Sequence, residues 1–79
     1  MARSFDATEF ADDLADASIS IYTLALRSRT PMFRMRRIAR GSVPPLDRRL
    51  RIASVLVDAI GGEDPPTPAE LADDIWPED

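Results

Sequence analysis

The sequence predicts an all-α fold, a compact bundle of about five short helices, and three observations support this prediction. Apolar residues recur at spacings of three and four, and no segment of alternating apolar and polar residues indicates a strand. Residues that favour helix starts precede these segments at Asp6, Ser20, Thr30 and Thr67. The length of 79 residues suits one small domain.

The first helix is expected to begin after Asp6. Asp6 and Glu9 have the spacing of a capping box, in which each side chain accepts the backbone N–H of the other residue. Phe10, Leu14 and Ala17 then form one apolar stripe at helical spacing. The acidic side of this helix is expected to face water.

The stretch from residue 20 to residue 41 predicts two short helices joined by a tight turn. Ser20 is placed to cap a helix over residues 21–28. Thr30, followed by proline at the first helical position, is placed to cap another over residues 31–39, which Gly41 closes in the left-handed conformation. Two helices joined this tightly are typical of the helix-turn-helix, whose second helix can enter the DNA major groove. The expected core residues are Leu24, Ala25, Met35 and Ile38.

A fourth helix is expected over residues 46–60 and should be the most buried one. A capping box at Thr67 and Glu70, with proline between them, predicts a fifth helix over residues 68–75. We therefore divide the chain into a helix-turn-helix domain, residues 1–62, and an acidic, proline-rich linker with a short C-terminal helix, residues 63–79. The inward face of the fourth helix is expected to hold Leu46, Leu50, Ala53, Val57 and Ile60, widened by Ile52, Val55 and Leu56.

Three placements are open for the apolar residues of the fifth helix. Leu71, Ile75 and Trp76 form a small patch at helical spacing. This patch could pack on the rest of the chain, it could join two subunits, or it could belong to a free, detachable tail.

Charge is divided sharply along the sequence, although the net charge is only −4. Residues 27–51 hold nine arginines against Asp47 alone, whereas residues 52–79 hold eight acids and no base. Residues 1–26 are also acidic, with five acids against Arg3. Blocks of this kind usually mark interaction surfaces, so the basic centre is the candidate binding region.

The composition argues against several classes of function. The chain has neither cysteine nor histidine, which removes the usual zinc ligands, disulfides and general base. Pairs such as Asp12 and Asp13 are adjacent on a helix and point apart, so they do not suggest catalysis. No apolar run is long enough for a membrane span. We expect a cytoplasmic protein that is no enzyme and has no cofactor, metal, membrane partner or small-molecule substrate.

The chain resembles the Cro and lambda-repressor-like helix-turn-helix family over roughly residues 6–60. It departs from the family at three places: Ile21 replaces a glutamine that binds phosphate, Arg29 a glycine in the turn, and Ala39 a frequent glutamate. The residues that carry the resemblance by their joint spacing are Ser20, Leu24, Ala25, Met35, Ile38, Gly41, Pro44, Ile52 and Ala53.

The resemblance implies which residues of the basic centre touch DNA. Base readout would fall to Met32, Phe33, Arg36 and Arg37, with arginine bidentate to guanine and the apolar side chains against thymine methyl groups. Met32 and Phe33 could instead pack in the core or contact a protein. The arginines could instead form a solvated face that pairs with the protein's own acids. The expected phosphate contacts are Arg27, Arg29, Arg34, Arg40, Arg48 and Arg49.

The function expected from these patterns is sequence-specific binding of double-stranded DNA by a small transcriptional regulator. The resemblance further implies a repressor of the type found in phages and mobile elements, acting as a homodimer on paired half-sites. The alternative is a protein-interaction module or antitoxin-like protein on the same fold, which the acidic ends of the chain would suit.

Overall fold

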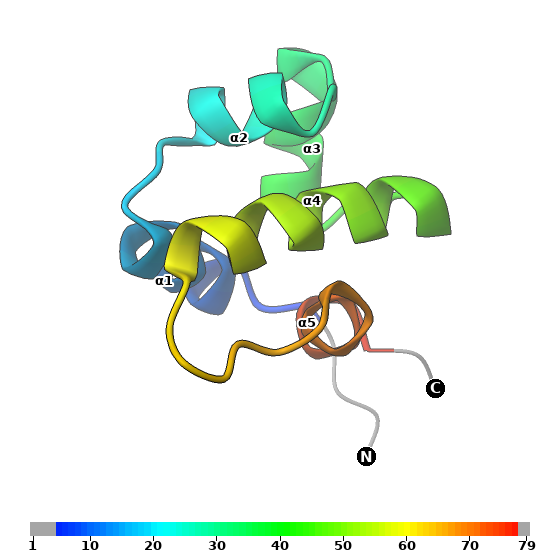
Figure 1. Cartoon of the computed structure of the whole chain (residues 1–79). Helices are drawn as coiled ribbons and strands as arrows, with labels where there is room; N and C mark the ends of the chain where they lie inside the picture. Colours follow the sequence, from blue (N-terminus) through cyan, green and yellow to red (C-terminus); the bar gives the residue numbers. More distant parts are fainter. Residues whose placement is uncertain (1–4, 78–79) are drawn as a thin grey trace.

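The computed structural model describes residues 5–77, and this part of the chain is all-helical, which confirms the predicted fold class (Figure 1). No helix in the described part is both long and apolar enough to cross a membrane. The five helices are α1 (Ala7–Ala17), α2 (Ile21–Arg27), α3 (Met32–Ala39), α4 (Leu46–Ile60) and α5 (Pro68–Ile75).

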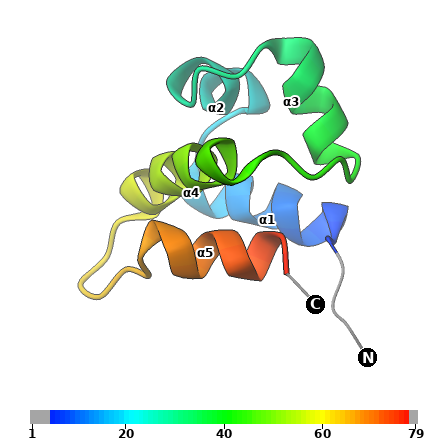
Figure 2. The same cartoon turned by 90° about the vertical axis from the view of Figure 1, so that its right-hand side faces the viewer.

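Helix α4 lies at the centre and contacts α1, α2 and α5. Figure 2 shows α2 and α3 on one side of α4 and α5 on the opposite side. Helices α2 and α3, which carry Arg27, Arg34, Arg36 and Arg37, are therefore separated by α4 from the acidic C-terminal helix. This arrangement keeps the outward side of α3 free of other helices.

Three of the four predicted helix starts are confirmed by their capping contacts. The carboxylate of Asp6 accepts two backbone N–H groups of the first turn of α1, at 2.8 and 3.2 Å. The hydroxyl of Ser20 accepts the N–H of Thr23 at 3.1 Å. At α5 the hydroxyl of Thr67 accepts the N–H of Glu70 at 3.2 Å, and the Glu70 carboxylate accepts the N–H of Thr67 at 3.3 Å. These contacts satisfy N–H groups that a helix cannot pair internally.

The prediction that Thr30 caps α3 is wrong. The Thr30 side chain is buried, and its hydroxyl accepts a hydrogen bond from the Ser28 hydroxyl at 3.1 Å. Helix α3 begins one residue later, where the carbonyl of Pro31 accepts the N–H groups of Arg34 and Met35. Because the Thr30 hydroxyl is held inside the turn, it makes no contact with the first N–H groups of α3.

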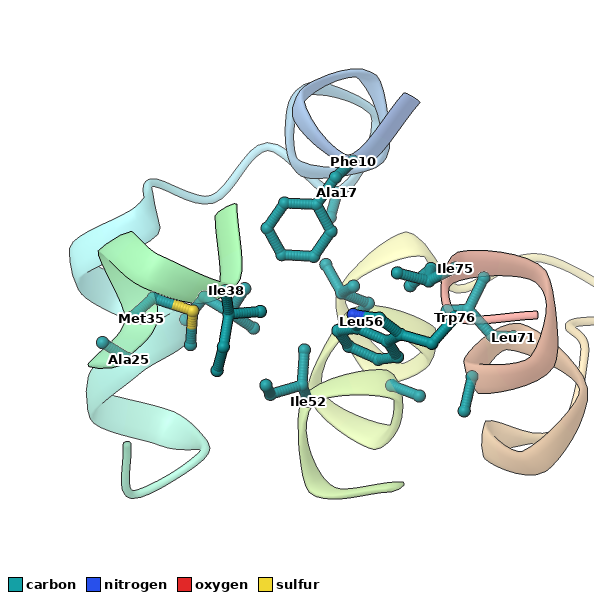
Figure 3. Packing of buried hydrophobic residues seen from close by; sticks show 13 residues of the cluster. Phe10, Ala17, Ala25, Met35, Ile38, Ile52, Leu56, Leu71, Ile75 and Trp76 are labelled. Carbon is teal, nitrogen blue, oxygen red and sulfur yellow. The ribbon is translucent and has the colours of Figure 1, made fainter. Parts of the chain in front are cut away.

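The core joins all five helices (Figure 3). Met35 and Ile38 enter it from α3 as predicted, and Trp76 from the end of α5 is only 2% exposed. Phe5 stacks on the Trp76 ring with 6.4 Å between the ring centroids. Leu71 and Ile75 are buried as well, so the patch on α5 packs within its own chain. The buried apolar residues are Phe10, Ala17, Leu24, Ala25, Met35, Ile38, Ile52, Ala53, Leu56, Leu71, Ala72, Ile75 and Trp76.

The inward face of α4 is shorter than predicted. Leu46 is 59% exposed and Ile60 is 40% exposed, whereas Ile52 and Leu56 are fully buried. Leu50 is half-buried and only flanks the core. Helix α4 has 15 residues, while its neighbours have between 7 and 11, so both of its ends extend past the helices that could cover them.

Two leucines of α4 should therefore respond very differently to the same substitution. We expect Leu56→Ala to lower the free energy of unfolding by about 2–5 kcal/mol, because a cavity remains in the core. Leu46→Ala should change it by less than about 0.5 kcal/mol, because the side chain already lies in water. Urea unfolding of both variants measures the difference. Equal losses would contradict the observed burial along α4.

Candidate nucleic-acid interface

The turn between α2 and α3 places a non-glycine residue in the left-handed region. Arg29 has a φ angle of +55°, and its N–H donates to the carbonyl of Leu26 at 3.3 Å. The N–H of Thr30 donates to the carbonyl of Ala25 at 2.9 Å. These two bonds form a Schellman motif, which needs a positive φ angle at the position of Arg29. The positive φ angle at residue 29 explains why glycine would suit this position of the turn, where this chain has arginine.

Replacing this arginine should separate stability from binding. A non-glycine residue in the left-handed region costs about 1–2 kcal/mol of folding free energy, and glycine removes this cost. Glycine also makes the unfolded chain more flexible, which lowers stability by about 0.4–1 kcal/mol and cancels part of the gain. Both Arg29→Gly and Ser18→Gly, whose φ angle is +56°, should therefore stabilise the fold by up to about 1 kcal/mol. Only Arg29→Gly should also weaken DNA binding. Urea unfolding and a DNA-binding titration of both variants check this. If both substitutions changed the DNA affinity by the same amount, Arg29 would not belong to the interface.

Arg51 fixes the same turn from α4, a role that was missed in the sequence. Its Nε donates to the carbonyl of Ser28 at 3.1 Å, and its Nη1 lies 3.2 Å from the carboxylate of Asp47. The spacing of Asp47 and Arg51, four residues apart on a helix, is the sequence signal that could have indicated this ion pair. The bond to Ser28 joins residues 23 positions apart, and no local pattern indicates it. Arg51 thus holds the turn in place.

The side chains at the start of α3 divide between the core and the surface. Met32 is half-buried and packs against the core, which leaves it little surface for a base contact. Phe33 is 59% exposed, and the guanidinium carbon of Arg34 lies 5.5 Å from its ring centroid. A cation over an aromatic face is attracted to it, so the two side chains support each other on the outward side of the helix.

Six of the predicted DNA contacts form an exposed arginine face. Within residues 5–77 none of these six guanidinium groups pairs with a carboxylate, so the described acids do not neutralise the face. Arg48 and Arg49, at the start of α4, are only half-exposed. The members of the arginine face are Arg27, Arg29, Arg34, Arg36, Arg37 and Arg40.

Gly41 turns the chain from α3 towards α4, as predicted. Its φ angle is +117°, a value that side-chain-bearing residues rarely adopt. Its N–H donates to the carbonyl of Ile38 at 3.0 Å, and the N–H of Ser42 donates to that of Arg37, also at 3.0 Å. This second Schellman motif brings the end of α3 against the start of α4.

A small hollow of about 110 Å³ opens where these two helices meet. Arg34, Arg37 and Arg48 line it together with Ile38 and residues 42–45, and none of the acidic residues within the described range 5–77 does. We call this the basic hollow. The Nε atom of Arg48 is buried and has no hydrogen-bond partner among the described residues. The site therefore joins Arg37, predicted to read bases, to two arginines predicted to bind phosphate.

A larger hollow of about 350 Å³ lies between α1 and α5, and its charge is opposite. Burial raises the pKa of the Asp13 carboxyl above its usual value, and the nearby carboxylates, Asp16 first, raise it further. Within residues 5–77, no group of three or more acidic side chains is placed to hold a metal ion. The acids that line this hollow are Asp6, Glu9, Asp12, Asp13 and Asp74.

The two charged regions lie on different sides of the molecule. Figure 2 places α3, which carries part of the arginine face, on the far side of α4 from α5. DNA approaching the arginine face would thus stay away from most of the carboxylates.

Comparison with protein-family models, with curated proteins and with solved structures finds no match for this chain.

Proposed function

We propose that this protein binds double-stranded DNA through the arginine face and acts as a small sequence-specific transcriptional regulator. The observation that carries the proposal is the set of six exposed arginines without carboxylate partners in the described residues, gathered around a tight helix-turn-helix. Guanidinium groups of this kind attract phosphate oxygens and can bind them through two parallel hydrogen bonds.

In this proposal α3 lies in the major groove and its outward residues read bases. Arg36 suits a bidentate contact to guanine, and the exposed ring of Phe33 suits contact with a thymine methyl group. Met32 contributes less, because it packs against the core. The other members of the arginine face contact phosphates and set the orientation of the protein.

A helix of eight residues buries little surface on its own, which favours a homodimer on paired half-sites. Repression, an origin in phages or mobile elements and action in the cytoplasm complete the proposal. Repression and the origin in phages or mobile elements rest on the resemblance to the Cro and lambda-repressor-like family, whereas action in the cytoplasm rests on the composition.

The salt dependence of binding to duplex DNA tests the proposal. A protein that neutralises about 6–10 phosphates loses about 10³–10⁵ in affinity between about 50 and 200 mM salt, because counterions are released. We expect a steep slope of this kind on random DNA, and a tighter, equally salt-dependent complex on sequences selected from a random pool. A flat slope on both would refute the proposal.

A protein-interaction module remains the second candidate because of two exposed apolar residues on α2. Leu26 is 81% exposed and Tyr22, one helical turn before it, is 62% exposed. Leu26 has no group that can bond to a phosphate, and together with the Tyr22 ring it forms an apolar strip beside the turn. A flat salt slope combined with binding to a protein would favour this function.

A further inference from the structure

We infer that the basic hollow is a binding site for one phosphate group, held by Arg34, Arg37 and Arg48. The inference deepens the proposed function and rests on it where the phosphate belongs to DNA. A backbone phosphate of DNA and free inorganic phosphate share the chemistry that the hollow would recognise.

The first argument is the convergence of charge. Two arginines from α3 and one from α4 line the same small space, and no carboxylate of the described part of the chain shares it. Three like charges around one hollow repel one another, and a phosphate that lies among them offsets this repulsion because it attracts each of the three. Arginine suits this role because its planar group offers several donors to one anion.

The second argument is the buried donor of Arg48. Its Nε–H is shielded from water and finds no acceptor among the described residues. A buried donor without a partner is costly, and proteins seldom keep one without a reason. A phosphate oxygen in the hollow is an acceptor of the right kind because it is charged, and it reaches this donor when the Arg48 side chain turns its guanidinium edge towards the hollow.

The third argument is the start of α4. This helix of 15 residues begins after Pro45, and no side chain caps its first N–H groups. Such an end attracts anions through its free N–H groups and through the helix dipole. Asp47, the acid in its first turn, is paired with Arg51 at 3.2 Å, which reduces its repulsion of an incoming anion. The hydroxyl of Ser42, which also lines the hollow, offers a neutral donor.

The size of the hollow permits this ligand. A single water needs about 10–15 Å³ of such space, so a hollow of about 110 Å³ has room for a tetrahedral oxyanion. The site also changes the division of roles on α3. Arg37 becomes a phosphate contact that fixes how the helix sits on DNA, and Arg36, which does not line the hollow, is left to read a base.

Free phosphate is the probe of the first experiment. Inorganic phosphate is titrated into the full chain while NMR follows the backbone amides and the arginine Nε–H signals. We expect saturable shifts of Arg34, Arg37 and Arg48 and of the first-turn amides of α4. Arg48→Gln and Arg34→Gln should abolish the saturation. Arg40→Gln, which removes an equal charge outside the hollow, should retain it.

DNA backbone phosphate is the probe of the second experiment. Neutral methylphosphonates replace single phosphates of a selected duplex, one position at a time. We expect one position in each half-site to lower affinity about tenfold or more, as for a lost charge-assisted hydrogen bond. With the Arg48→Gln protein, a methylphosphonate at the same position should lower the affinity very little. Circular dichroism verifies that each variant is folded. If Arg48→Gln does not fold, Arg34→Gln replaces it in this experiment, because Arg34 lies at an exposed position.

The two experiments distinguish free phosphate from DNA phosphate as the ligand of the hollow. They also distinguish failure of the phosphate site from failure of the proposed DNA binding. Saturation by inorganic phosphate without a sensitive DNA position assigns the hollow to free phosphate and supports the inference. A sensitive position without saturation assigns it to DNA and supports it too. If neither occurs while the salt slope is steep, the inference is overturned and DNA binding stands. If phosphate saturates the hollow but the protein does not bind DNA, the proposed function fails and the site remains.

Discussion

Ending the chain at Gly62 should unfold the domain at every protein concentration. The truncation removes Leu71, Ile75 and Trp76 from the core, where they are at most 8% exposed. Burying one large apolar side chain stabilises a fold by about 1.5–3 kcal/mol, so three contribute roughly 5–9 kcal/mol. A small domain has about 5–15 kcal/mol in total, and the cut also exposes the side of α4 that α5 covers.

Circular dichroism and thermal unfolding across a wide range of protein concentration measure this effect. Trp76→Ala alone should cost about 3–5 kcal/mol. As a control, neutralising the exposed acids Glu63 and Asp73 to glutamine and asparagine should leave the fold intact, because these side chains lie outside the core. A folded monomer after truncation would contradict the packing of α5. An intact fold combined with the loss of a dimer would assign the patch to a subunit interface.

Helix starts were predictable where the capping contact is local. Asp6, Ser20 and Thr67 each bond to N–H groups two or three residues ahead, so the sequence alone contains both partners. Thr30 has the same spacing pattern, but Ser28 competes for its hydroxyl inside the turn. Serine and threonine readily bond to nearby groups in turns as well as to helix ends. The sequence pattern does not distinguish these outcomes.

The burial of α4 shows where the helical spacing of apolar residues no longer predicts which side chains are buried. Helical spacing correctly placed Ile52, Ala53 and Leu56 towards the core. It also placed Leu46 and Ile60 there, because a pattern along one helix contains no information about the length of its neighbours. Burial at the ends of a helix depends on the elements packed against it, which only the three-dimensional structure gives.

The arginine face was predictable because charge burial is costly. Six arginines in a segment of 14 residues cannot all enter a small core without partners, and they lie on the surface as expected. Three features of the site were not predictable: the bond from Arg51 to the turn, the packing of Met32, and the meeting of Arg37 with Arg48. Each depends on how α3 and α4 are placed relative to each other, and the tight turn at Gly41 sets part of that placement.

Neutralising the outward side of α3 should abolish tight DNA binding without unfolding the protein. The triple variant Arg34→Gln, Arg36→Gln and Arg37→Gln removes three exposed charges and keeps good helix formers in their place. Loss of an arginine contact to DNA costs about 1–3 kcal/mol, so three should lower affinity at least a hundredfold. Titration of a selected duplex measures the loss, and circular dichroism verifies the fold.

A matched control decides whether the loss comes from local contacts or from overall charge. The variant Ala11→Glu, Ala15→Glu and Ala69→Glu changes the net charge from −4 by the same three units, at exposed positions on α1 and α5. Surface charges separated by more than about 8–10 Å are largely screened at physiological salt, so this variant should keep most of its affinity. Only the α3 variant should show a shallower salt slope, by about 0.9 for each lost phosphate contact. If both variants lost affinity equally, DNA would be responding to net charge, and the arginine face would not be the binding surface.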